Sequence, residues 1–223
     1  MAWARQLLRV NLTDGSINKE PLNMEWANDY LGQRGLATKY FTEEVDPKVE
    51  PLSPENKLIM TTGPLTGTTA STAGRYSVVT KGALTGAIAC SNSGGFFGNE
   101  MKNAGLDMII FEGKSDKPVY LFIDNDDIKL VDASDMWGTS VWDTEDKIKN
   151  DHQDPMIRVA SIGISGEKGV KYACVVNDYH RAAGRSGVGT VMGSKNLKAV
   201  AIRGSKGVTV EDPKAFMAAV SAG

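Results

Sequence analysis

Most of the glycines in this chain lie in two segments, and this distribution restricts the possible folds more than any other feature. Ten of the 24 glycines fall within residues 60–113 and nine within residues 163–207. In both segments they separate short apolar runs. Glycine at this density is typical of sharp turns, of close backbone approach, or of main-chain amides presented to a ligand. The distribution therefore predicts a β-rich chain with many tight turns, a ligand-binding backbone, or both.

The two glycine-rich segments also resemble each other. Both contain Ala-Gly-Arg, at residues 73–75 and 183–185, followed by valine and threonine at equal offsets. Both end in an apolar run that begins with leucine and closes on glycine, at residues 106–113 and 197–204. Chance agreement is one explanation of such short patterns. The other is a duplicated unit with pseudo-two-fold symmetry, in which each half presents a Gly-Arg turn.

Apolar periodicity and turn signals predict the secondary structure. Asp14-Gly15 after an alternating run predicts a β-hairpin near the N-terminus. Helical spacing of apolar residues predicts helices over 24–32 and 36–44, and a further helix is expected over 97–104. Ser140 predicts the start of a helix over 140–150. The remaining strands are expected at 57–61, 76–80, 87–90, 107–112, 118–123, 127–131, 157–161, 171–176 and 198–202.

A last helix is predicted at the C-terminus, where Asp212 precedes Pro213. It has no later segment to pack against, which suggests that the sequence has been cut from a longer one. We therefore expect one domain over residues 1–210, and in residues 211–223 the start of a helix that leads into missing C-terminal domains.

Charge and composition exclude several classes of function. The chain has 25 basic and 27 acidic residues, so it lacks a basic field for nucleic acid or for an anionic membrane. The longest apolar run, residues 215–220, is far shorter than the roughly 20 residues that span a bilayer. The N-terminus has no secretory signal. We expect a soluble, cytoplasmic protein that has neither nucleic acid nor a membrane as a partner.

Arginines and glycines that could bind an anionic group occur together in both glycine-rich segments. Arg75 lies upstream of Asn92-Ser93-Gly94-Gly95, and the second segment contains Arg181-Ala182-Ala183-Gly184-Arg185. Arginine presents a planar set of donors, and glycine lets main-chain amides approach oxyanions. Asn92 could give a neutral oxygen to a cation such as Mg²⁺. The pattern favours a site for a phosphate-bearing cofactor, although each arginine could instead bond to carbonyl groups of a turn.

Other chemistry is not indicated. Residues 193–195 read Gly-Ser-Lys, the wrong order for a P-loop, and Gly187, Gly189 and Gly193 fit the dinucleotide-binding fingerprint only loosely. His152 lies in a charged stretch and is expected to be solvated, and His180 could contact a ligand or simply complete a turn. The two cysteines are expected in strands, where they would be core residues. We therefore assign no catalytic residue to this chain.

The chain resembles the N-terminal domain of the tungsten-containing aldehyde:ferredoxin oxidoreductases. The stretches that carry the resemblance are Leu8–Leu12, Leu52–Leu58, Gly63–Thr68, Gly74–Tyr76, Asn92–Gly98, Lys102–Gly105, Arg181–Arg185 and Val191–Ala199. They cover nearly the whole chain in the family's order.

The resemblance implies an α+β, β-rich fold, with two β-sheets related by a pseudo-two-fold axis and a few peripheral helices. The sheets would form a saddle beneath a bis-pterin (bis-molybdopterin) cofactor with tungsten or molybdenum. It also implies a Mg²⁺ ion that links the two pterin phosphates, held by oxygens of Asn92 and Ala182. The residues that would bind the cofactor are Arg75, Asn92, Ser93, Gly94, Gly95, Arg181, Ala182, Gly184 and Arg185.

In the complete enzyme, the resemblance implies oxidation of an aldehyde to a carboxylic acid, with electrons passing through a [4Fe-4S] cluster to ferredoxin or another electron-transfer subunit. The cluster ligands would lie in later domains of the same enzyme, so this part alone is expected to be inactive. Three alternatives remain: the same domain of a tungsten aromatic acyl-CoA reductase, an NAD(P)-dependent enzyme, and a β-rich interaction module.

Overall fold

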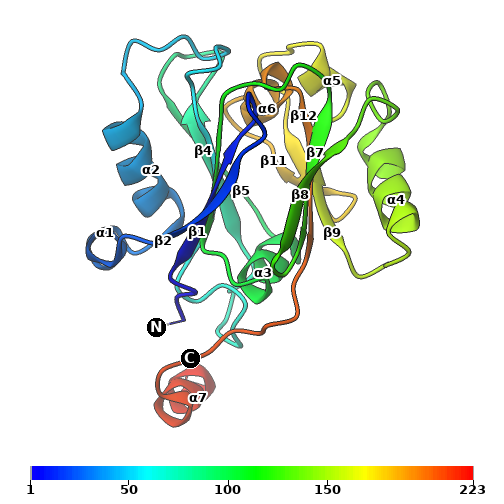
Figure 1. Ribbon diagram of the computed structural model, residues 1–223. Coiled ribbons are helices and arrows are strands. Elements are labelled where there is room, and N and C mark those ends of the chain that lie inside the picture. The colour runs from blue at the N-terminus through cyan, green and yellow to red at the C-terminus, as the bar shows by residue number, and fades with distance from the viewer. Residues whose placement is uncertain (1, 223) are drawn as a thin grey trace.

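The computed structural model describes residues 2–222, which form two six-stranded sheets and seven helices (Figure 1). Sheet A has the strand order β2 (Ile17–Pro21), β1 (Gln6–Asn11), β6 (Met108–Glu112), β3 (Leu58–Thr62), β4 (Tyr76–Lys81) and β5 (Ile88–Ser93). Sheet B has the order β8 (Asp127–Asp132), β7 (Val119–Asp124), β12 (Leu197–Arg203), β9 (Arg158–Ser161), β10 (Val175–Asn177) and β11 (Arg181–Ala183). The helices are α1 (Met24–Tyr30), α2 (Gln33–Glu44), α3 (Phe97–Asn103), α4 (Val141–Asp151), α5 (Ile164–Glu167), α6 (Val188–Ser194) and α7 (Pro213–Ala222).

The two halves of the chain have the same topology. In each sheet, an antiparallel hairpin (β1–β2 or β7–β8) lies beside a parallel strand (β6 or β12). The other three strands continue each sheet with antiparallel pairing. A short helix precedes the parallel strand in both halves, α3 before β6 and α6 before β12. This arrangement is what a duplicated unit with pseudo-two-fold symmetry requires, and the predicted fold class is confirmed.

One of the two sequence matches that suggested duplication is wrong. After Arg75 the chain enters β4, so Val78 lies in a strand, whereas Val188, at the same offset from Arg185, begins α6. The paths diverge because Gly187 adopts a left-handed conformation, with φ of +67°, and starts a helix there. The second match is correct, since its two apolar runs are the equivalent strands β6 and β12.

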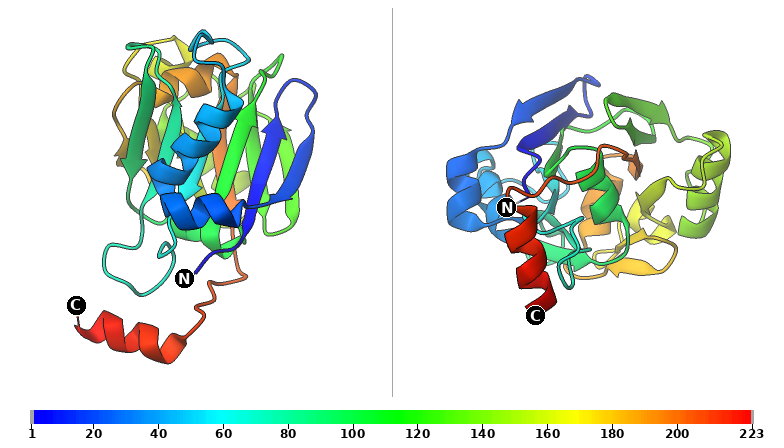
Figure 2. Two further views of the ribbon diagram at one scale, coloured as in Figure 1. Left: turned by 90° about the vertical axis from the view of Figure 1, so that its left-hand side faces the viewer. Right: turned by 90° about the horizontal axis from the view of Figure 1, so that it is seen from below.

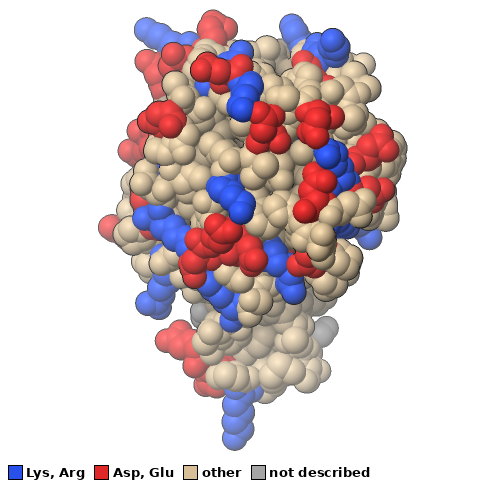
Figure 3. Space-filling model, turned by 45° about the vertical axis from the view of Figure 1, so that its right-hand side comes forward, with Lys and Arg blue, Asp and Glu red and all other residues tan. Residues whose placement is uncertain are grey.

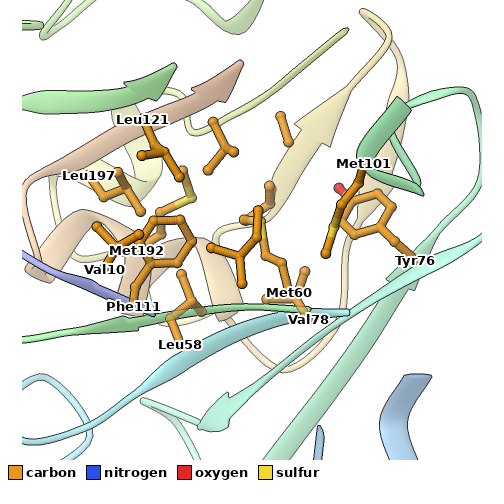
Figure 4. Close-up of a cluster of buried hydrophobic side chains, with 14 of the residues drawn as sticks. Val10, Leu58, Met60, Tyr76, Val78, Met101, Phe111, Leu121, Met192 and Leu197 are labelled. Atoms are coloured by element: carbon orange, nitrogen blue, oxygen red, sulfur yellow. The ribbon is translucent and has the colours of Figure 1, made fainter. Parts of the chain in front are cut away.

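The main core fills the space between the sheets. Side chains from β1, β3, β4 and β6 face those from β7 and β12, and α3 and α6 close the two ends of this space (Figures 1 and 4). A second cluster lies between sheet A and α1–α2, and a third between sheet B and α4. Strands that are buried on both faces read as continuous apolar runs, which explains why β3, β6 and β12 were predictable.

The helices agree with prediction in most positions. Leu36, Tyr40 and Phe41 of α2 are buried on one face, and the Ser140 hydroxyl accepts a hydrogen bond from the Asp143 amide at the start of α4. The helix expected over 24–32 instead ends at Tyr30, because Leu31 has a positive φ of 62°. As a result, Leu31 lies outside the helix and is exposed, as is Tyr30 at its end.

Several polar and glycine-rich stretches differ from prediction. The strand expected over 171–176 is only β10, and Cys174 lies outside it and is half-buried. Residues 181–183 form strand β11 rather than a turn, and α5 and α6 were not predicted. His152 is only partly exposed: its ring stacks on Phe122 with 3.7 Å between ring centroids, and Nε2 lies 2.8 Å from the Tyr120 hydroxyl. Burial lowers the pKa of His152.

Lys195 is fully buried at the turn between α6 and β12, where its ammonium group joins the two halves. Its Nζ donates to the carbonyl oxygen of Gly113 at 2.9 Å and to that of Pro54 at 3.2 Å. Carbonyl groups replace only part of the lost hydration, so burial lowers the pKa of Lys195 to about 8.

This pKa predicts how stability depends on pH. In the folded chain Lys195 loses its proton near pH 8, whereas the unfolded chain loses it near the ordinary value of 10.5. Between these values unfolding takes up a proton, so the free energy of unfolding rises with pH, by up to about 3 kcal/mol. Urea denaturation of the chain and of Lys195→Met at pH 7 to 10.5 measures this rise. If the free energy of unfolding rises with pH by the same amount in both proteins, the prediction is wrong.

Helix α7 lies apart from the two-sheet body, below it in Figure 1, and has no buried residue. Its start is as predicted, because an Asp212 side-chain oxygen accepts a hydrogen bond from the Ala215 amide at 2.9 Å. Within residues 2–222, no helix has the length and hydropathy needed to cross a membrane. Acidic and basic side chains are interspersed over the face shown in Figure 3, with no field of a single sign.

Candidate cofactor-binding site

The predicted site residues gather where the last strands of the two sheets meet. β5 is an edge strand of sheet A and β11 an edge strand of sheet B, and the two strands contact each other. This junction lies on the side of the molecule opposite the β1–β2 hairpin (Figure 2). We call residues 94–96, between β5 and α3, loop A, and residues 184–187, between β11 and α6, loop B. The two loops occupy equivalent places in the two halves.

All nine residues predicted to bind the cofactor lie at this junction. Asn92 and Ala182 are each the second-last residue of an edge strand, β5 and β11, so the two predicted metal ligands occupy equivalent positions. Arg75, Asn92, Arg181, Ala182, Gly184 and Arg185 are exposed, and Gly94 and Gly95 are partly so. Ser93 differs, because the whole residue is buried and is only 2% exposed.

Contacts between each loop and the edge strand of the other half bring the two sets of residues into one patch. A Cβ atom on Gly95 of loop A would lie 3.2 Å from Cγ of Arg181, in β11. In the other direction, the Arg185 amide of loop B donates to the Ser91 hydroxyl of β5 at 3.0 Å. The predicted arginines and glycines therefore face the same region from both halves.

Arg75 is held over β5 by both its side chain and its main chain. Its Nη1 donates to the Asn92 side-chain oxygen at 2.6 Å. Its carbonyl oxygen accepts from the side-chain amide (Nε2) of Gln33 at 3.1 Å and from the Thr66 hydroxyl at 3.2 Å. These hydrogen bonds fix the backbone of Arg75 and orient its guanidinium, while the side chain stays exposed. An exposed, positioned guanidinium suits an anionic ligand.

The glycines of the junction serve different purposes. A Cβ on Gly94 would meet no atom within 4 Å, and one on Gly184 would meet only the Ala182 side chain at 3.9 Å. These two positions have open space above the backbone, where a ligand could approach. Gly95 is structural, because its φ is +92° and a Cβ would lie 2.2 Å from Oδ2 of Asp178.

A buried polar network beneath loop A was not predicted from sequence. Asn177, fully buried, donates to the Gly94 carbonyl at 2.9 Å and accepts from the Tyr76 hydroxyl at 3.2 Å. Oδ2 of Asp178 accepts from the Phe96 amide at 2.7 Å. Burial, and then the Asp178 charge, raise the pKa of Tyr76, so its hydroxyl stays protonated and donates. Asn-Asp at this point is ordinary turn composition, so no sequence signal identifies it.

A cavity of about 310 Å³ opens beside loop A. Phe96, Arg158, Tyr179, His180 and Arg181 are among the side chains that line it. The Arg158 guanidinium lies over the Phe96 ring, 5.0 Å from its centroid. His180 is exposed in this wall, so an imidazole lies beside the arginines.

The junction provides donors and open main chain, and little that could perform acid–base or metal chemistry alone. No group of three or more His, Cys, Asp or Glu side chains able to hold a metal is found in the part of the chain that the structure describes. Cys90 and Cys174 are both free and half-buried. The arrangement is suited to binding a large anionic group through arginines and backbone.

Comparisons with known proteins agree on one family. Residues 7–204 match the family model for the N-terminal domain of aldehyde ferredoxin oxidoreductase. The chain is 55% identical over 215 residues to a tungsten-containing aldehyde ferredoxin oxidoreductase of Pyrococcus abyssi, and 54% identical over 218 residues to that of Pyrococcus furiosus. These matches cover 96% and 98% of this chain but only 35% and 36% of the relatives.

Two more distant similarities extend the range of related activities. A protein of Pyrococcus furiosus named as the WOR-like subunit of an aliphatic sulfonate oxidoreductase is 36% identical over 221 residues, with 92% of this chain and 35% of the relative covered. Among solved structures, the active-site complex BamBC of benzoyl coenzyme A reductase, with 1,5 dienoyl-CoA, superposes with a TM-score of 0.96. The two sequences are 40% identical. The match covers 99% of this chain and 34% of the chain in that structure.

Proposed function

Because the chain belongs to the family of aldehyde ferredoxin oxidoreductase N-terminal domains, we propose that it binds a tungsten–bis-pterin cofactor at the junction of β5 and β11. One observation carries the proposal: the two sheets bring equivalent loops with open glycine backbone to one edge of the molecule, beside exposed arginines from both halves. Two halves of one topology are suited to a ligand whose own two halves are alike. Each loop would then bind one phosphate-bearing pterin.

The residues at the junction fit such a cofactor chemically. Arg75, Arg181 and Arg185 are exposed and would balance phosphate charge. Open space above Gly94 and Gly184 would admit a group that lies against the main chain. The nearest carboxylate to loop A, Asp178, already accepts the Phe96 amide through one oxygen, so its charge is partly compensated.

A Mg²⁺ ion between the phosphates would take its protein oxygens from the main chain. The side-chain oxygen of Asn92 already accepts a hydrogen bond from Arg75 at 2.6 Å, and Ala182 has no polar side chain. Both residues lie in edge strands, whose outer carbonyl groups have no hydrogen-bonded strand partner. Main-chain carbonyl oxygens are suitable ligands for this hard cation.

We propose that this domain, residues 1–210, serves a larger enzyme that oxidises aldehydes to carboxylic acids. The cofactor, when bound, supplies the two-electron redox chemistry, and this chain binds and orients it. Because the chain spans about 35% of the relatives' length, other domains would supply a [4Fe-4S] cluster and the acid–base groups, with residues 211–223 leading toward them. Ferredoxin or another electron-transfer subunit would accept the electrons.

Two alternatives are less well supported. The aromatic acyl-CoA reductase has the same fold, but identity to that structure is 40%, against 54–55% for the aldehyde enzymes. The glycines that fit the dinucleotide-binding fingerprint loosely do not support nicotinamide binding. Cβ atoms on Gly187, Gly189 and Gly193 would lie 2.0 to 2.3 Å from carbonyl oxygens of other segments, so these glycines allow α6 to pack closely and are not open to a nucleotide.

Removing the arginines tests the proposed function. We expect Arg75→Gln and Arg181→Gln, each in the full-length enzyme, to lower tungsten and pterin content by about tenfold, because each removes a charge-assisted hydrogen bond to phosphate. Tungsten by mass spectrometry and pterin by fluorescence of its oxidised derivative measure the content. Arg5→Gln, which makes the same charge change at an exposed site outside the junction, is the matched control. Equal losses in all three variants, or none, would refute the assignment.

A further inference from the structure

Each loop of the junction is held by side chains from the opposite half of the chain. Loop A belongs to the first half, but its main chain is bonded by Asn177 and Asp178 of the second. Loop B belongs to the second half, and its Arg185 amide donates to the hydroxyl of Ser91 in the first. Ser91 and Asn177 are both buried, so water does not compete for these bonds. The two loops are therefore not independent of each other.

The Asp178 carboxylate bonds the main chain of loop A. Oδ2 accepts from the Phe96 amide at 2.7 Å and from the Asn177 side chain at 2.8 Å. Oδ1 is buried and has no hydrogen-bond partner among the described residues. The nearest cation is Nη1 of Arg158, 3.9 Å from Oδ1, which is too long for a hydrogen bond.

The backbone around Asp178 is strained in a way that fits this role. Asp178 and the following Tyr179 both have positive φ, of 47° and 64°, which is uncommon for residues other than glycine. Such a conformation persists only where the surroundings enforce it. On the opposite side of the contact, Gly95 has no Cβ, and this allows Oδ2 to approach loop A. The fit between the turn and the loop therefore depends on particular residues on both sides.

We propose that Asp178 and Ser91 are positioning residues of the cofactor site, each of which orders the loop of the opposite half. Asp178 bonds the main chain of loop A, and Ser91 bonds that of loop B. Neither is assigned a contact with the cofactor. The inference rests on the proposed function for what the loops bind, but the ordering itself concerns only this chain. It follows that the two loops form together, when the two sheets come together.

Substitutions at Asp178 separate hydrogen bonding from charge. Asparagine at this position keeps an oxygen that can accept from the Phe96 amide, whereas alanine keeps none. In the full-length protein prepared without cofactor, we expect Asp178→Ala to speed hydrogen exchange at residues 94–98 by about tenfold or more. Asp178→Asn should stay near the wild-type rate. Equal acceleration in both variants, or in neither, would overturn the positioning role.

Ser91 gives an independent test on the other loop. Ser91→Ala should speed exchange at residues 184–188, and Ser91→Thr, which retains a hydroxyl, should not. Peptides from β2 and β8, away from the junction, should exchange at unchanged rates in every variant. Faster exchange throughout the protein would show a loss of overall stability in place of local ordering and would contradict the proposal.

Cofactor content then distinguishes this inference from the proposed function. In protein prepared with cofactor, Asp178→Ala should retain several-fold less tungsten and pterin than Asp178→Asn. If exchange responds as expected but both variants retain full cofactor, the positioning role is wrong. If wild-type protein never contains tungsten or pterin, the proposed function fails, and the exchange results still decide whether each half orders the loop of the other.

Discussion

A side chain at residue 94 is expected to exclude the cofactor without disturbing the fold. Gly94 lies in loop A, its φ is not in the left-handed region, and a Cβ there would meet no protein atom within 4 Å. The fold therefore tolerates a side chain, but the space it would fill is where we place the ligand. We expect the tungsten content of the full-length enzyme to fall by on the order of tenfold in Gly94→Val and by less in Gly94→Ala.

Thermal unfolding of the cofactor-free protein should be nearly unchanged in both variants, which separates this result from simple destabilisation. Gly163→Ala is the matched control, because its Cβ would make an ordinary contact, 3.5 Å from Val141, at the start of α5. It should retain full cofactor. Undiminished tungsten in Gly94→Val would show that the ligand does not lie over loop A.

The largest effect on stability is expected at a buried ion pair in the first half. Lys102 in α3 bonds Asp107, just before β6, and both side chains are almost fully buried. Burial lowers the pKa of Lys102, and the Asp107 charge opposes that change. Lys102→Ala leaves the Asp107 carboxylate buried without its counter-ion. We expect the free energy of unfolding to fall by about 3–5 kcal/mol, measured by urea denaturation of this chain.

Removing both charges should lower the free energy of unfolding much less than removing only one of them. Asp107 also accepts hydrogen bonds from the main-chain amides of Ala4, at 3.2 Å, and Arg5, at 2.6 Å. The two amides bond different oxygens of the carboxylate, and asparagine at residue 107 keeps one of these two acceptors. The double variant Lys102→Met with Asp107→Asn should therefore recover at least half of the loss. A double variant that is less stable than Lys102→Ala would contradict this explanation.

Sequence patterns predicted the fold where local rules operate. The Asp14-Gly15 hairpin, the Ser140 cap and the buried strands β3, β6 and β12 each follow from a few neighbouring residues. The same rules failed at β11 and α6, where glycines and small residues give little periodicity. Helix α6 is stabilised by packing, since several of its residues are fully buried, and such tertiary stabilisation leaves no helical signal in the sequence.

The arginines and glycines of the candidate site were predictable from the sequence, but the side chains that support its loops were not. The arginines and glycines were identified from their residue types and from the resemblance, and the structure brings them together. Their supports were not identified, because Ser91, Asn177 and Asp178 act across the two halves, 82 or more residues from the main-chain groups they bond. His152 was misjudged for a similar reason: its charged neighbours in sequence do not reveal the aromatic side chains that cover it.

Loops A and B are proposed to bind the two ends of one doubly phosphorylated cofactor. A crystal structure of the full-length enzyme, with anomalous data at the tungsten edge, tests this directly. We predict two phosphate groups joined by a cation between residues 92–95 and 181–185, belonging to the same molecule as the metal. Phosphates on only one loop, or a metal–pterin group located away from the β5–β11 junction, would contradict it.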